Sequence, residues 1–168
     1  AAYPGTYAAL GGGSIGGYYE NELTERDDGW PASMAAAEVI ERRCVSCHDD
    51  MRSLPRHLSD ENGLSFWRPE WDDARLMRSR HLVYNLSRPE KSLILMAPLA
   101  KESGGFGFCQ APDASGEMTP VFASASDPDY QKLLAMCVAG KERLETIGRF
   151  DMPGFRPPFP YLREMQRY

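Results

Sequence analysis

The sequence predicts a mostly α-helical domain with long loops and an extended N-terminal arm. Two stretches show clear helical spacing of apolar residues, and no region is rich in strand signals. Thirteen prolines and fifteen glycines predict many turns between short helices. A chain of 168 residues with 42% hydrophobic residues is long enough to build one core. We therefore expect an arm or linker over residues 1–30 and one domain over 31–168, with a long insertion around 51–126.

The first helix is expected over residues 32–44. The arm before it is rich in glycine, which is the composition of a linker. Pro31 then stands at a favourable first helical position, and strong helix formers follow it. Helical spacing gives this helix one apolar face, made of Met34, Ala37, Val39, Ile40 and Cys44.

The predicted insertion contains two short helices and a polar loop. Residues 71–86 have helical spacing, and 87–99 form a third helix with a proline in its first turn. The inward residues of the earlier helix are expected to be Leu76, Leu82 and Val83. Residues 102–126 are glycine-rich and polar, so we expect a loop with a little strand structure at 119–123.

The clearest helix is predicted over residues 126–147, with Gly148 ending it. Asp127 is a good N-cap, and Pro128 follows at the first helical position. The apolar residues at helical spacing are Tyr130, Leu133, Leu134, Cys137, Val138 and Leu144. A proline-rich segment that cannot be helical comes next, and a short helix over 161–168 closes the chain.

Residues 44–48, Cys-Val-Ser-Cys-His, form a C-x-x-C-H motif, the attachment pattern of c-type haem. Residues three apart lie on the same side of a helical turn, so both thiols can add to the vinyl groups on one haem edge. The next residue, His48, can then reach the iron, for which histidine is a common ligand. The motif predicts one covalent haem c, with Cys44 and Cys47 as its thioether residues.

Three other interpretations of the motif are weaker. A dithiol redox site uses C-x-x-C in a βαβ context, which is not predicted here. A zinc site needs two further ligands at close spacing, and Cys109, Cys137 and His57 stand far apart in the sequence. A disulfide between cysteines three apart in a helix has poor geometry. Haem attachment is therefore the favoured interpretation.

The sixth iron ligand is predicted to be Met152. Prolines stiffen the loop around it, so that holding the thioether in place costs less ordering entropy. His81, on the predicted second helix, is the alternative, and a bis-His site would have a lower potential. Met118 and Met96 are weaker candidates, and His57 is expected to be a solvated loop histidine.

The helix followed by Cys-Val-Ser-Cys-His, and the late Met-Pro before a terminal helix, resemble class I cytochrome c. The resemblance covers roughly residues 32–48 and 127–168. It implies a mostly α fold around one covalent haem, export before haem attachment and single-electron transfer. Carried over to this chain, it implies Cys44 and Cys47 as thioether residues, with the iron held by His48 and Met152.

Two further stretches, NLSRPEKSLILMAPLAKESGG and RFDMPGFRP, are similar to the cytochrome portion of large multidomain proteins related to the hydrazine synthase alpha subunit. This likeness implies a redox domain that follows another domain, in agreement with the arm over 1–30. It does not imply hydrazine chemistry, because function must be argued from a site.

Two further predictions concern the surroundings of the haem. Cys109 and Cys137 would face an oxidising space, where two thiols tend to close, so we expect a disulfide between them. Buried haem propionates need cationic or hydrogen-bonding partners, and Arg149 and Arg156 flank Met152.

We expect an electron carrier or redox domain rather than an enzyme, located in a bacterial periplasm or outside the cell. Its partner would be a redox protein or an adjoining oxidoreductase domain. A bis-His domain of a larger extracytoplasmic oxidoreductase, or an open-site haem enzyme, are the alternatives. The net charge of −5 argues against nucleic acid, and the chain lacks an apolar run long enough to span a membrane.

Overall fold

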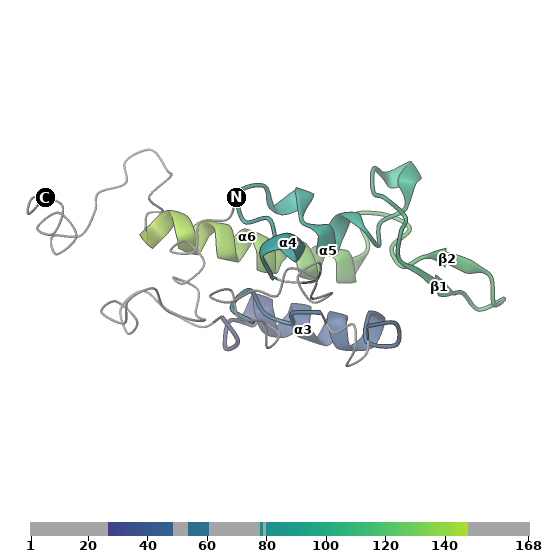
Figure 1. Cartoon of the computed structure of the whole chain (residues 1–168), viewed down its shortest axis with the longest axis horizontal. Helices are drawn as coiled ribbons and strands as arrows, with labels where there is room; N and C mark the ends of the chain where they lie inside the picture. The colour runs from purple at the N-terminus through teal and green to yellow at the C-terminus, as the bar shows by residue number, and fades with distance from the viewer. Residues whose placement is uncertain (1–26, 49–53, 61–77, 79, 148–168) are drawn as a thin grey trace, which may run out of the picture.

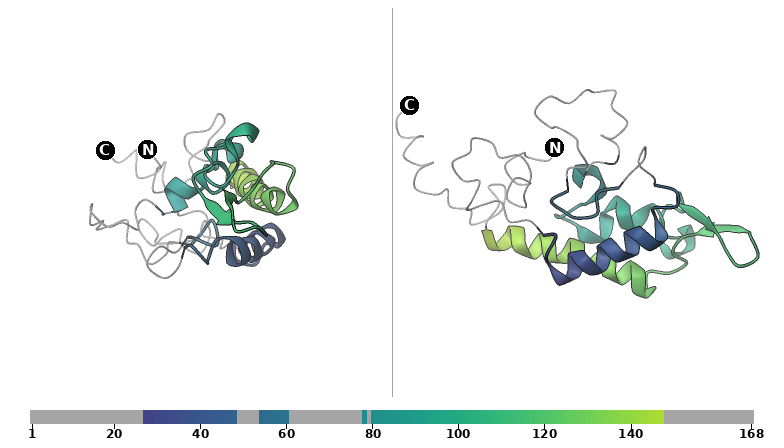
Figure 2. Two further views of the ribbon diagram at one scale, coloured as in Figure 1. Left: turned by 90° about the vertical axis from the view of Figure 1, so that its right-hand side faces the viewer. Right: turned by 90° about the horizontal axis from the view of Figure 1, so that it is seen from below.

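The computed structural model describes residues 27–48, 54–60, 78 and 80–147. Two long helices form its framework, α3 (Pro31–Arg43) and α6 (Pro128–Ile147). They pack against each other and run in opposite directions, so the end of α3 meets the start of α6 (Figures 1 and 2). Helices make up 47% of the described residues, which fits the mostly α prediction at this coarse level.

Short elements lie between the two long helices in the sequence. In chain order they are α4 (Arg80–Val83), the 3-10 turn η2 (Pro89–Lys91), α5 (Leu93–Met96) and the 3-10 turn η3 (Lys101–Ser103). A two-stranded antiparallel hairpin follows, β1 (Gln110–Pro112) with β2 (Met118–Pro120), in which Ala111 pairs with Thr119. The hairpin projects from the core at the end where α3 finishes (Figure 1).

The core fills the space between α3, α6 and the short elements. Its fully buried large side chains include Tyr84 and Phe122, and the Phe122 ring meets Tyr130 edge-on at 5.8 Å between centroids. Apolar burial of this kind supplies most of the stabilisation of a small domain. The remaining core residues are Ala36, Val39, Ile40, Leu58, Val83, Leu86, Ile94, Leu95, Leu99, Leu133, Met136 and Cys137.

The two long helices confirm the sequence predictions to within a residue or two. The Asp127 carboxylate accepts the N–H of Asp129 at 2.8 Å and so caps α6. The predicted apolar face of α3 was partly wrong. Met34 is 54% exposed, and Ser33 and Ala36 are buried in its place, with the Ser33 hydroxyl bonded to the buried Asp27.

The predicted helix over 87–99 was wrong as a single element. Ser92 is extended (φ −61°, ψ 136°) and separates η2 from α5. Its buried hydroxyl accepts the N–H of Asn85 at 2.9 Å, so the break closes the preceding loop. In the predicted helix over 71–86, the structure shows helix only at α4 among the described residues, and Leu82 is 53% exposed whereas Val83 is buried.

The strand expected at 119–123 is displaced and has a partner. It is β2, and the tight turn before it is held by the Asp113 carboxylate, which accepts the N–H groups of Ser115 (2.7 Å) and Glu117 (3.1 Å). Gly116 takes the left-handed conformation there, at φ 86°. An Asx turn with glycine is a local hairpin signal that the sequence analysis passed over.

A buried carboxylate joins residues 54–60 to the start of α3. Asp27 is fully buried and accepts four hydrogen bonds, from the Ser33 hydroxyl (2.6 Å), the Leu58 N–H (2.9 Å), and the N–H (2.9 Å) and hydroxyl (2.6 Å) of Ser59. Arg56 adds an exposed ion pair to Glu41 at 2.8 Å. Residues 54–60 are therefore fixed along α3.

Candidate haem-attachment site

The C-x-x-C-H motif continues directly from the last turn of α3. The N–H of Cys44 still donates to the Ile40 carbonyl (2.9 Å). The carbonyl of Cys44 then accepts the N–H groups of Cys47 (3.1 Å) and His48 (2.9 Å). One closed turn therefore carries both thiols and the imidazole, which is the local geometry that the spacing predicts.

The three side chains of the motif lie at the surface. Cys47 is exposed, whereas Cys44 and His48 are partly buried. Burial raises the pKa of the Cys44 thiol to about 11, and the neighbouring Cys109 and Cys47 thiols add to the rise. Cys44 is therefore a neutral thiol at pH 7, next to a more accessible one.

Arg43 ties this turn to the rest of the molecule. Its guanidinium lies over the Phe122 ring, 5.1 Å from the centroid, and donates to the Val121 carbonyl. It also donates to the Asp129 carboxylate at 3.2 Å, which accepts a second hydrogen bond from Arg42 at 2.6 Å. The basic end of α3 thus meets the acidic start of α6, an arrangement that stabilises both helix dipoles.

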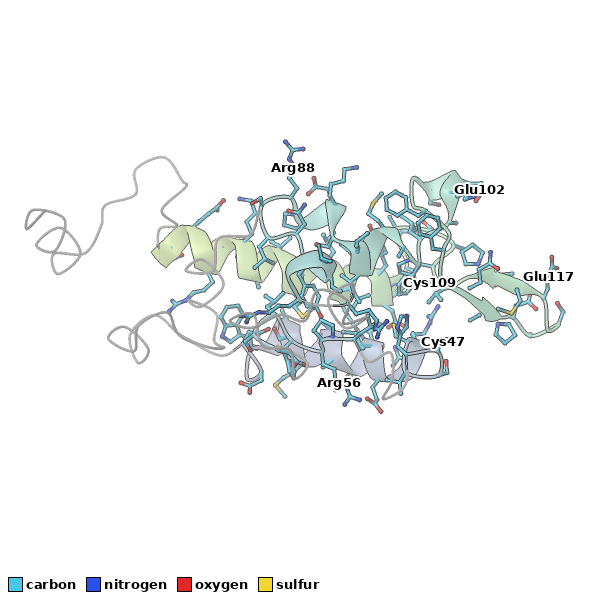
Figure 3. All side chains as sticks on the ribbon, in the orientation of Figure 1. Cys47, Arg56, Arg88, Glu102, Cys109 and Glu117 are labelled. Atoms are coloured by element: carbon cyan, nitrogen blue, oxygen red, sulfur yellow. The ribbon has the colours of Figure 1, made fainter. Side chains whose placement is uncertain are left out.

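The base of the hairpin lies beside the motif. The Val121 N–H donates to the Cys109 carbonyl (3.2 Å), and the Cys109 N–H donates to Ala97 (3.1 Å). Because Val121 is also bonded to Arg43, two hydrogen bonds connect the residue before the motif to Cys109. Figure 3 shows Cys47 and Cys109 at the same end of the molecule. The sequence alone could not identify this neighbour, since no local pattern links Cys109 to the motif.

The structure shows no disulfide between Cys109 and Cys137, since all four cysteines are free thiols. Cys137 lies on α6 inside the core and is fully buried. Burial raises the pKa of the Cys137 thiol to about 11. Cys109 is instead held by backbone hydrogen bonds to Ala97 and Val121 at the hairpin base, at the same end of the molecule as Cys47.

The candidates for the sixth ligand are only partly within the described residues. Met152 lies outside them, as do Arg149 and Arg156. The backbone of His81 belongs to α4.

The weaker candidates differ in exposure. Met96 is 8% exposed in the core, and Met118 is 55% exposed on β2. His57 is not the solvated histidine that we predicted. It is partly buried, and its Nδ1 is enclosed without a hydrogen-bond partner in the part of the chain that the structure describes.

The structure bears on two rival interpretations of the motif. Within the described ranges, no three histidine, cysteine or acidic residues gather into a metal-binding group. The motif also stands at the C-terminal end of α3, where the partial negative charge of the helix disfavours a thiolate. Reactive dithiols instead favour helix N-termini, where the thiolate is stabilised.

Comparison with known proteins returned no matching family, no matching curated protein and no matching solved structure. The functional interpretation therefore depends on the motif and its surroundings. Over the described residues, no helix has both the length and the apolar character needed to cross a bilayer.

Proposed function

We propose that this chain is a c-type cytochrome domain that transfers single electrons through one covalently attached haem. The observation that carries the proposal is the closed turn over residues 44–48, which presents two thiols and an imidazole at the surface end of α3. A partner redox protein, or an adjoining oxidoreductase domain, would exchange electrons with this domain in a bacterial periplasm or outside the cell.

The residues present fit a haem. Cys47 is exposed and the Cys44 and His48 side chains are only partly buried, so a macrocycle can reach them without displacing the core. A cysteine must be a free, reduced thiol to add across a haem vinyl group, and both motif cysteines are free in the structure. The bound group would supply one-electron chemistry at iron, with its potential set by the axial ligands.

The surrounding residues have distinct roles in the proposal. Arg43 fixes the position of the attachment turn by joining it to Val121 and Asp129. Met152 is proposed as the sixth ligand, with His81 as the alternative. Arg149 and Arg156 are proposed as partners of the propionates, because they flank Met152 in the sequence.

The test is expression of the full chain in a bacterial host that carries a c-type haem maturation system. The purified protein is denatured, treated with acid–acetone, and examined for haem that stays with the polypeptide. Retained pigment, and its loss in the Cys44→Ala and Cys47→Ala double variant, supports the proposal. Cys137→Ala is the matched control, because it removes a thiol that lies inside the core. A colourless protein, or complete release of the pigment, refutes the proposal.

The visible spectrum of the matured protein distinguishes a carrier from an open haem site. Six-coordinate low-spin haem that titrates as a one-electron couple supports electron transfer. High-spin five-coordinate iron would support an open-site haem enzyme instead.

A further inference from the structure

Cys109 is the one residue outside the C-x-x-C-H motif whose thiol the structure brings to it. Two backbone hydrogen bonds hold Cys109 in place. Its N–H donates to the Ala97 carbonyl, and its carbonyl accepts the N–H of Val121. Val121 in turn accepts a bond from Arg43, the residue directly before the motif. Figure 3 shows Cys47 and Cys109 at the same end of the molecule, where the hairpin base meets the end of α3.

The four thiols differ in what they can pair with. Cys137 is fully buried in the core on α6, where an oxidant cannot reach it, so it is a poor partner for Cys109. Cys44 and Cys47 are held on one closed turn, in which their bond to each other has unfavourable geometry. Cys47 is the exposed thiol of the motif and therefore the one that meets an oxidant first.

We propose that Cys109 is a third thiol of this site, which closes a disulfide with Cys47 while no haem is attached. The effect of this disulfide on haem loading rests on the proposed function. If haem attaches at Cys47, a Cys47 sulfur held in a disulfide cannot add to the haem vinyl group. Cys109 would thereby control access to the attachment site. Haem loading would need a reductant that opens the bond.

The bond forms by thiol–disulfide exchange with a low-molecular-weight disulfide. The Cys47 sulfur first attacks oxidised glutathione, which releases one glutathione and leaves a mixed disulfide. The Cys109 sulfur then attacks the Cys47 sulfur and releases the second glutathione. Two S–H bonds and the glutathione S–S bond are broken, and one protein S–S bond forms. The two protons and two electrons leave on the two reduced glutathione molecules.

The test uses the full chain, produced without haem in a host that lacks the maturation system. The reduced protein is equilibrated with oxidised glutathione, its free thiols are alkylated, and it is digested with trypsin without reduction. The motif cysteines fall in peptide 44–52, Cys109 in 102–132 and Cys137 in 133–141. The expected product in the mass spectrum is peptide 44–52 joined to peptide 102–132.

Two variants show which motif cysteine pairs with Cys109, and a sample in urea tests whether this pairing requires the folded structure. The cross-link should persist in Cys44→Ser and disappear in Cys47→Ser. In concentrated urea the native preference should give way to a mixture of pairings. Three results would overturn the proposal. They are a disulfide within peptide 44–52, a disulfide between peptides 102–132 and 133–141, and the same mixture of disulfides with and without urea. A cross-link that persists in Cys47→Ser would also overturn it.

The failure of this inference can be told apart from the failure of the proposed function. If the matured chain keeps its haem through acid–acetone but the haem-free chain forms no such cross-link, only the role of Cys109 is wrong. If the cross-link forms but no haem can be attached, the proposed function is wrong and the disulfide stands. If haem attachment and the Cys47–Cys109 disulfide are both confirmed, the chain that carries the disulfide should load haem more slowly in vitro. The loading rate should recover when the disulfide is reduced, or in the Cys109→Ser variant.

Discussion

Replacing Arg43 with alanine should destabilise the domain and loosen the attachment turn. The change removes a hydrogen bond, a cation–π contact and the ion pairs with Asp127 and Asp129 at once. The hydrogen bond from the charged guanidinium to the Val121 carbonyl is of a kind that contributes about 1.5–3 kcal/mol. The cation–π contact with buried Phe122 and the partly exposed ion pair with Asp129 each add about 0.5–1 kcal/mol. Because shared contacts are not additive, we expect a loss of about 2–3 kcal/mol.

Urea unfolding of the full chain, followed by far-UV circular dichroism, measures this loss. Arg42→Ala is the matched control. It removes the exposed neighbour that binds the same Asp129 carboxylate, but leaves the contacts with Val121 and Phe122 in place. Its effect should be clearly smaller. Arg43→Lys should fall between, because lysine keeps the charge but lacks the planar fork that reaches both Val121 and Asp129.

A free energy of unfolding for Arg43→Ala within about 0.5 kcal/mol of the unsubstituted chain, the range of a surface change, would refute this reasoning. The same variant has a second readout. If Arg43 holds the hairpin base against the motif, its removal should also lower the yield of the Cys47–Cys109 cross-link. A stable variant with an undiminished cross-link would mean that Cys109 is positioned by other contacts.

Three further results are expected. Asp27→Ala removes the acceptor of four hydrogen bonds. It should lower the free energy of unfolding by about 1–3 kcal/mol for each buried donor that finds no other acceptor, whereas the exposed Glu38→Ala should change it little in the same urea titration. The hydrogen bond from Arg42 holds the pKa of Asp129 below its usual value. The ionised Asp129 therefore stabilises the fold above the unfolded pKa of about 3.9, and this stabilisation is lost as the pH falls through the lower folded pKa. Unfolding at pH 7 and in acid should therefore differ less in Asp129→Asn, and an unchanged difference would contradict this cause. Met152→Ala should convert the proposed low-spin haem to a different spectrum, and an unaltered spectrum would redirect the test to His81.

The sequence was sufficient for features that depend on near neighbours. Proline at the first helical position, strong helix formers and an aspartate cap located α3 and α6 to within a residue or two. The C-x-x-C-H spacing likewise predicts the turn that the backbone forms at Cys44. These features follow from propensity, capping and i,i+3 geometry, which act within a few residues and need no partner from elsewhere in the chain.

The tertiary structure decided whatever depends on a partner distant in the sequence. Helical spacing alone put Met34 in the core, but tertiary packing buries Ala36 and Ser33, the latter bonded to the buried Asp27. The extended Ser92, with its bond to Asn85, interrupts a stretch that local propensity made continuous. An oxidising environment suggested that Cys109 would pair with Cys137, yet the hairpin base brings Cys109 to the motif. The pairing of distant residues is set by which arrangement buries the apolar surface and satisfies the backbone, and both are properties of the whole packed chain.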